Sequence, residues 1–114
     1  MTGLAPEAVA LLDALLAGDG PAHRALRAQI PHLRVTGRCP CPCASIDVDL
    51  DRAAVPAAPA AAHPAAEATV LAADGQPVGG VLVFASAGYL SGLEVYTWQD
   101  EPITRFPPPD RLAP

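Results

Sequence analysis

The sequence contains no lysine and no asparagine, and aromatic residues make up only 4% of its 114 positions. Arginine is therefore the only basic side chain that is always charged, and acidic residues outnumber it to give a formal net charge of -5. A net negative charge argues against nucleic acids and anionic membranes as partners, because both repel it. With so few aromatic rings, the core has to be built mainly from leucine, valine and alanine.

Long apolar runs and an export signal are also missing. No stretch approaches the roughly 20 apolar residues that cross a membrane as a helix. The first residues lack a basic segment, and Asp13 interrupts the apolar stretch 11–17. We therefore expect a cytoplasmic protein that is not attached to a membrane. Thiols in the cytoplasm are mostly reduced, so we do not expect a permanent disulfide.

The motifs of the common nucleotide-binding and hydrolytic enzymes are absent as well. The chain has no glycine-rich phosphate loop, no Walker motif, no dinucleotide-binding fingerprint and no nucleophile elbow. No cysteine has a base and an orienting group close to it in the sequence, as a catalytic nucleophile requires. Of the possible classes of function, the sequence therefore favours a small enzyme least.

The residues that are present predict first a helical hairpin over residues 5–30. One helix is expected over 5–17, where Pro6 suits the first helical position and leucines recur on one face. A second helix is expected over 21–30, and Pro31 should stop it. Both helices precede the first expected strand, so they form one helical unit ahead of the sheet.

Over residues 33–51 the period changes from helical to two, which predicts a β-hairpin with the cysteines at its tip. Each strand then has one apolar and one polar face, and aspartates line the polar face of the second strand. Two registers fit this alternation. The one with more opposite-charge pairs is favoured, since each pair contributes about 0.2–1 kcal/mol. The favoured register has the pairs Arg38–Asp47 and Arg34–Asp51, and the other has only Arg34–Asp49.

The rest of the chain divides into an alanine- and proline-rich connection over 53–66, a β-meander over 68–98 and a tail over 99–114. The connection lacks large apolar groups, so it should run extended over the surface. The prolines of the tail cannot continue a sheet, so the tail should pack over an edge. Together with the helical hairpin, these segments predict a single α+β domain spanning 1–114. In it, the helices pack on one face of a mainly antiparallel sheet of about five strands.

Two features of the meander shape the expected sheet. Residues 78–85 are apolar on both faces, which fits a strand in the middle of the sheet. If the helices cover only one face, the other face of this strand would be covered by a partner or by self-association. In the last strand, Leu90 and Leu93 are out of step with a strict alternation, and a β-bulge near Gly92 would reconcile them.

All the cysteines of the chain lie close together, as Cys39, Cys41 and Cys43, and they alternate with prolines. Thiolates are ligands for zinc and for Cu(I), so this hairpin tip is a candidate metal site. Alternate residues of an extended strand lie about 7 Å apart, so the loop would have to curl to gather the sulfurs around one ion. Zinc would also need a fourth ligand, for which His63 and His23 are candidates by residue type only.

Two other interpretations of the cysteines stay open. A pair such as Cys39 and Cys43 could form a reversible disulfide and act as a redox switch. Cysteine is also a small, frequently buried residue, and Cys39 falls on the apolar face of its strand, so the cysteines could simply pack beneath the hairpin tip. Cys41 and Cys43, in the exposed part of the loop, are the thiols to test first.

Glu94, Tyr96 and Trp98 share one face of the last long strand and lie close in the sequence to Asp100 and Glu101. Tyrosine and tryptophan are enriched among the residues that dominate protein interfaces, so the first three residues form a candidate interaction surface. We therefore expect a small, non-catalytic binding protein that binds an unknown protein partner or a second copy of itself. The alternative is a thiol site at the hairpin tip that binds zinc or copper or acts as a redox switch.

Two stretches of the chain together resemble a family of small proteins from high-GC bacteria. The first comprises residues 26–29 and 35–47, with the run Cys39-Pro40-Cys41-Pro42-Cys43, and the second comprises 74–77, 81–84, 88–96 and 106–107. Members of the family carry the pattern Cys-x-Cys-Gly-Cys, and Pro42 of this chain stands in the place of the glycine. The resemblance covers most of the chain except the alanine- and proline-rich connection, and it implies no particular activity.

Overall fold

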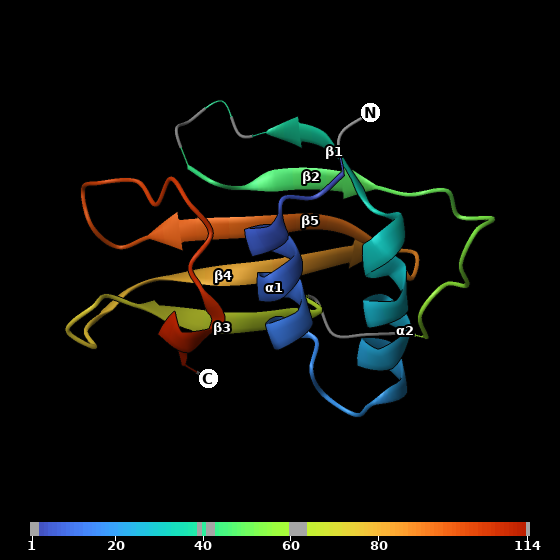
Figure 1. The fold of residues 1–114 in the computed structure, drawn as a ribbon, viewed down its shortest axis with the longest axis horizontal. Helices are drawn as coiled ribbons and strands as arrows, with labels where there is room; N and C mark the ends of the chain where they lie inside the picture. The colour runs from blue at the N-terminus through green and yellow to red at the C-terminus, as the bar shows by residue number, and fades with distance from the viewer. Residues whose placement is uncertain (1–2, 39, 41–42, 60–63, 114) are drawn as a thin grey trace.

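The computed structural model describes residues 3–38, 40, 43–59 and 64–113. Two helices, α1 (Pro6–Leu15) and α2 (Pro21–Gln29), are followed by the 3-10 turn η1 (Ile30–His32). The strands are β1 (Arg34–Arg38), β2 (Ile46–Asp49), β3 (Ala66–Leu71), β4 (Pro77–Ser86), β5 (Tyr89–Thr97) and β6 (Leu112–Ala113), with the 3-10 turn η2 (Pro109–Arg111) before β6. They form one antiparallel sheet in the order β1-β2-β5-β4-β3-β6 (Figure 1). The α+β class is thus confirmed, with six strands where about five were expected.

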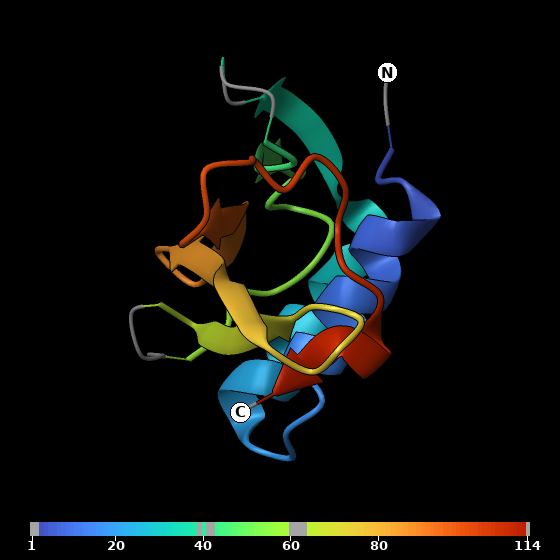
Figure 2. The same cartoon turned by 90° about the vertical axis from the view of Figure 1, so that its left-hand side faces the viewer.

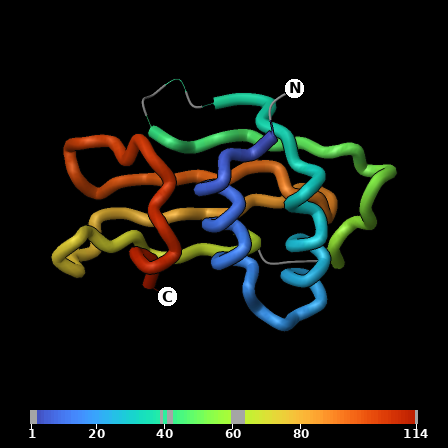
Figure 3. The backbone as a smooth tube through the Cα atoms, viewed as in Figure 1, coloured from blue at the N-terminus to red at the C-terminus, as the bar shows by residue number. Residues whose placement is uncertain are grey.

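Both helices lie on the same face of the sheet (Figure 2). Each begins with a proline, Pro6 or Pro21, whose fixed φ suits the first helical turn. Leu12 of α1 and Leu26 of α2 are almost completely buried against the core face of the sheet. The tail passes beside α1 on this same side and ends against β3 (Figure 3). Helices and tail therefore cover one face of the sheet together.

The expected β-bulge in the last long strand is present. The pairing of β4 with β5 shifts by one residue between Phe84, which lies opposite Gly92, and Ala85, which lies opposite Leu90. Ser91 is thereby left as the extra residue of the bulge. Leu90 and Leu93 consequently both point into the core, where they are 2% and 1% exposed.

The favoured register of the first hairpin is wrong. Arg34 lies opposite Asp49, and a bulge after Val35 shifts the pairing so that Arg38 lies opposite Ile46 rather than Asp47. Exposed ion pairs contribute too little to select a register against the packing of the apolar face. The pKa of Asp49 is lowered below its usual value, mainly because the Leu50 backbone N–H bonds the charged carboxylate. The Arg34 guanidinium, 3.4 Å from this carboxylate, lowers the pKa to a smaller extent.

The edges of the sheet also differ from the expectation. The tail was expected only to pack over an edge, yet its last residues form β6, in which Leu112 lies opposite Val70 of β3. Its run of prolines ends at Pro109, so residues 110–113 keep the N–H groups that a strand needs. At the opposite edge, Gly3 forms a single bridge with Arg34 of β1.

The alanine- and proline-rich connection runs over the surface only in part, and residues 60–63 lie outside the described chain. Val55 and Ala58 are buried, with exposed fractions of 7% and 9%. The Ala58 N–H donates to the Gly88 carbonyl over 2.8 Å, so the connection packs against the turn between β4 and β5. Small side chains suit this position because Ala57 and Ala58 approach the backbone of Gly88 closely.

Gln29 is the one buried polar side chain among the described residues, and its exposed fraction is 0%. Its Nε2 donates to the Gly88 carbonyl over 2.8 Å and to the Pro56 carbonyl over 3.3 Å. Its Oε1 accepts from the Leu90 N–H over 2.9 Å. One amide group at the end of α2 therefore joins the connection and the β4–β5 turn to the helical layer.

Neither α1 nor α2 has the length and apolar character that a membrane crossing requires.

Candidate functional site

The face of the sheet that points away from the helices carries the candidate site. Side chains alternate along β5, so Gly92, Glu94 and Tyr96 face outward while Leu93 and Val95 point into the core. The residues opposite the outward three on β4 are Phe84, Leu82 and Gly80. Both helices lie on the other side of the sheet (Figure 2), and of the tail only Pro102 and Ile103 line the cleft beside these positions.

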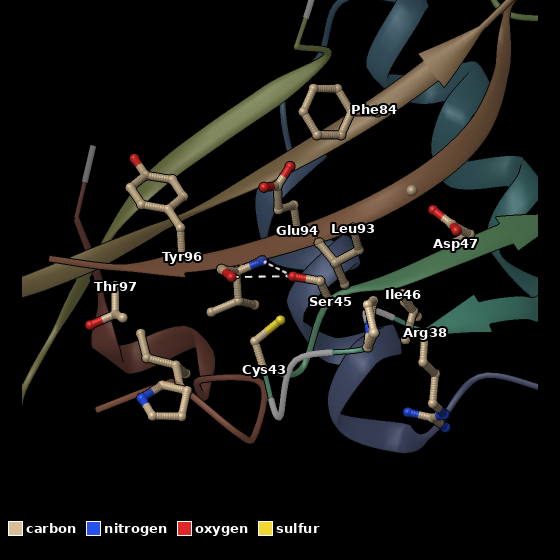
Figure 4. Close-up of a pocket in the computed structure, with 15 residues that line it drawn as sticks. Arg38, Cys43, Ser45, Ile46, Asp47, Phe84, Leu93, Glu94, Tyr96 and Thr97 are labelled. Atoms are coloured by element: carbon tan, nitrogen blue, oxygen red, sulfur yellow. Dashed lines mark hydrogen bonds between the residues drawn. The ribbon is translucent and has the colours of Figure 1, made fainter. Parts of the chain in front are cut away.

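A cleft of about 550 Å³ opens beside β5 on this face (Figure 4). Its volume falls in the range of roughly 300–1,000 Å³ that is typical of ligand sites. The polar and aromatic side chains that define it come from four strands and from the segment before β2. They are Arg38, Cys43, Asp47, Phe84, Glu94 and Tyr96.

Gly92 forms part of the floor of this cleft. A Cβ atom at this position would lie 3.9 Å from Asp47 Oδ1 and 3.9 Å from Phe84 Cδ2. On β1, Gly37 lies opposite Asp47, and a Cβ atom there would lie 3.1 Å from Asp47 Oδ2. Glycines on both neighbouring strands therefore leave the Asp47 carboxylate open, with a hollow above Gly92 between this carboxylate and the Phe84 ring.

The predicted interaction surface is brought together by the fold. Tyr96 and Trp98 are the large hydrophobic residues that are most exposed in the described chain, at 37% and 60%. Their ring centroids lie 6.2 Å apart at an angle of 57°. The Tyr96 ring lies over Gly80, where a methyl group would overlap the phenol. Trp98 follows directly after the end of β5, and Glu94 is exposed within it.

Ser45 forms hydrogen bonds with the backbone at the edge of β5 next to the cleft. Among the described residues, β2 pairs with β5 only at Ile46–Leu93 and Asp47–Gly92. Beyond this point the Ser45 hydroxyl takes the place of a strand, because its Oγ accepts from the Val95 N–H over 2.9 Å and donates to the Val95 carbonyl over 3.2 Å (Figure 4). Both groups of Val95 are thus satisfied without a neighbouring strand.

Of the predicted thiol ligands, the structure describes only Cys43, since Cys39 and Cys41 lie outside the described residues. Cys43 is disulfide-bonded and lines the cleft. A disulfide at Cys43 agrees with the cysteine pairing that the redox interpretation requires, and the absence of a permanent disulfide stays a prediction. In this oxidised state Cys43 is not a thiolate, and a thiolate is what zinc or Cu(I) binds.

Of the two histidines considered as a fourth zinc ligand, only His23 can be compared with Cys43. His63 lies outside the described residues, whereas the His23 Nε2 bonds the Ala65 carbonyl over 3.1 Å at the start of β3. In the sheet, β3 beside His23 and β2 beside Cys43 are separated by three strand spacings, or about 14 Å. Within the described chain, no three histidine, cysteine or acidic side chains are grouped to hold a metal ion.

The cleft carries uncompensated negative charge. Asp47 and Glu94 are both exposed, and neither forms an ion pair with another described residue. Arg38 lines the same cleft, but its guanidinium group points away from both carboxylates (Figure 4). The site therefore combines two open carboxylates with the Phe84 and Tyr96 rings.

Sequence reasoning identified Cys43, Glu94 and Tyr96 but missed Asp47 and Phe84. Alternation along one strand assigns Asp47 to a polar face, but it does not predict which strand will pair beside Asp47. The site depends on the row Asp47–Gly92–Phe84, which crosses β2, β5 and β4. A glycine at an outward position of a strand with a predicted bulge was the one signal in the sequence that could have pointed to it.

Comparisons with known proteins were negative in every case. No protein-family model matches the chain, and no curated protein or solved structure matches it.

Proposed function

We propose that this chain is a small, non-catalytic binding protein that holds a partner protein on the open face of its sheet. The observation that carries the proposal is the asymmetry of the sheet. Helices and tail bury one face, while the other exposes Tyr96 and Trp98 beside a cleft of about 550 Å³. Exposed aromatic residues grouped around a cleft are typical of protein interaction sites.

The chemistry of the cleft supports binding rather than catalysis. Among the described residues that line it there is no histidine, and the Ser45 hydroxyl is engaged by both backbone groups of Val95. The carboxylates of Asp47 and Glu94 repel nucleic acids and anionic lipids, which supports a protein as the partner.

The test uses the intact protein as bait in a lysate, followed by titration of the purified partner by calorimetry. Tyr96→Ala and Trp98→Ala are each expected to weaken binding by at least tenfold, because exposed aromatic anchors of this kind are typical interface hot spots. Asp13→Ala, on the exposed side of α1, is the matched control and should keep the wild-type affinity. A partner that binds all variants equally well would show that the open face is not the binding surface.

A second candidate function, a redox switch, is favoured by the disulfide of Cys43 in the wall of the cleft. We keep the cytoplasm as the proposed compartment, where disulfides are usually transient and regulatory. Reduction would release the segment before β2, from which Cys43 and Ser45 line the cleft. The reduced thiols would then also be available to zinc or Cu(I).

Thiol counting and elemental analysis test this candidate. We expect one reactive thiol per chain before reduction and all three after it, since the chain has three cysteines and Cys43 is disulfide-bonded. Reduction should also change the affinity for the partner in the wild type, but not in Cys43→Ser. Stoichiometric metal in the reduced protein that is lost in Cys41→Ser would support a metal site instead. Equal partner affinity in both redox states would refute the switch.

A further inference from the structure

We propose that the cleft recognises an arginine side chain in an extended, basic segment of the partner protein, with the guanidinium group held over Gly92. The inference rests on the proposed function and names the chemistry of the partner. It follows from the shape of the hollow, its charge, its aromatic walls and the length of the cleft.

The hollow over Gly92 provides the space. Gly92 has no side chain, so the strand is bare at this point of the cleft floor. The atoms nearest to a Cβ placed at Gly92 would be 3.5–3.9 Å away, which leaves room for one. The neighbours are the Ile46 carbonyl oxygen, Asp47 Oδ1 and Phe84 Cδ2. A flat group can therefore lie on the strand between the Asp47 carboxylate and the Phe84 ring.

The charge of the hollow selects a cation. Asp47 borders Gly92 from β2, and Glu94 follows on the same face of β5 about 7 Å along the strand. Neither carboxylate has an ion-pair partner among the described residues. A guanidinium group has five N–H donors in one plane, so it can bind one carboxylate with two hydrogen bonds and still reach a second acceptor.

The aromatic rings favour arginine over lysine. Phe84 and Tyr96 lie on either side of Glu94 (Figure 4), and a guanidinium plane stacks on aromatic faces more readily than an ammonium group does. The fold already contains one such contact elsewhere, because the Arg52 guanidinium lies 4.7 Å from the centroid of the Tyr89 ring.

The length of the cleft favours an extended segment. Its wall follows β5 from Gly92 to Thr97, which corresponds to about 17 Å of strand. Pro102 and Ile103 line it as well and supply an apolar surface. A segment with arginine and leucine at alternate positions would place both on the same side, with arginine over Gly92 and leucine against the apolar wall. A second copy of this chain fits less well, because the two acidic faces would repel each other.

The probe for the test is the synthetic peptide acetyl-Ser-Arg-Ser-Leu-Ser-Leu-Ser-amide. Binding is followed by NMR chemical shifts and by the fluorescence of Trp98, the single tryptophan of the chain. We expect shifts centred on Gly92 and Glu94, and at least tenfold weaker binding when neutral citrulline replaces the arginine. Equal binding of the citrulline peptide would overturn the inference.

Three variants locate the arginine. Gly92→Ala should keep the fold, since its new methyl group meets only ordinary contacts of 3.5–3.9 Å, but it fills the hollow and should weaken binding about tenfold. Asp47→Asn should weaken binding about fivefold. Asp49→Asn changes the net charge by the same amount outside the cleft and should have little effect. If Asp49→Asn weakens binding as much as Asp47→Asn, general charge attraction explains the result and the inference fails.

The outcome is distinguishable from a failure of the proposed function. A partner that depends on Tyr96 and Trp98, together with a peptide that does not bind, would refute the arginine site and leave the binding protein intact. A mass that rises with concentration in sedimentation, and that Tyr96→Ala lowers to the monomer, would identify a second copy as the occupant and would refute the arginine site.

Discussion

Replacing Gln29 by alanine is expected to lower the free energy of unfolding by about 3 kcal/mol. The side chain is 0% exposed and bonds three backbone groups, which are the Gly88 and Pro56 carbonyls and the Leu90 N–H. Truncation leaves the buried Leu90 N–H without its partner, which costs about 1–3 kcal/mol unless water replaces the amide. The Gly88 carbonyl keeps its hydrogen bond from the Ala58 N–H, so each of the two hydrogen bonds lost at the carbonyls costs only about 1 kcal/mol. A loss of this size is a large part of the stability of a small domain.

Urea denaturation measures the effect. Gln76→Ala is the matched control, because Gln76 is exposed and bonds other described residues through its backbone N–H and carbonyl. The variant should therefore stay within about 0.5 kcal/mol of the wild type. Gln29→Glu keeps the shape but removes the amide donor, and it should therefore also be strongly destabilised. Equal denaturation midpoints for Gln29→Ala and Gln76→Ala would show that the buried amide does not hold the two layers together.

Replacing Gly88 by alanine is expected to cost about 3 kcal/mol, from backbone strain and from steric overlap together. Gly88 has a φ of 85°, which disfavours any side chain. A Cβ atom here would also lie 2.6 Å from the Ala58 carbonyl oxygen and 2.9 Å from Ala57 Cβ. The connection would have to move, and the hydrogen bond from the Ala58 N–H to the Gly88 carbonyl would be lost.

Gly75→Ala separates the two contributions. Gly75 has a φ of 87°, nearly the same as Gly88, but no atom lies within 4 Å of a Cβ at this position. It should therefore show the strain alone, about 1–2 kcal/mol. The effect of the added methyl group on the unfolded chain is similar at both glycines, so the difference between the variants reports the packing of the connection. Equal losses would contradict that packing.

The elements of the fold could be predicted because their signals are local. Prolines at helix starts, leucines at helical spacing and the change to a period of two locate α1, α2 and most strands to within a few residues. The bulge near Gly92 was also predictable, since Leu90 and Leu93 can only both be buried if one residue is extra. These are properties of one segment at a time, so the sequence of that segment is sufficient.

The pairings between segments could not be predicted in the same way. The register of β1 with β2 depends on how Val48 and Ile46 pack across the sheet, and charge pairs on the exposed side were a poor guide to it. β6 arises because the tail returns to β3, which no local pattern indicates. The cleft could not be predicted for the same reason, since its lining comes from four strands, the segment before β2 and the tail.

The ends of the sheet bear on how this protein avoids ordered aggregation. Long, flat outer strands template the addition of further strands, and proteins blunt them with bulges and short segments. Here one outer strand, β1, is interrupted by a bulge and bridged by Gly3, and the other, β6, has only two residues. Stacking of copies strand to strand is thus disfavoured at both ends. The partner proposed above would be bound instead at the open face, where side chains rather than backbone groups select what binds.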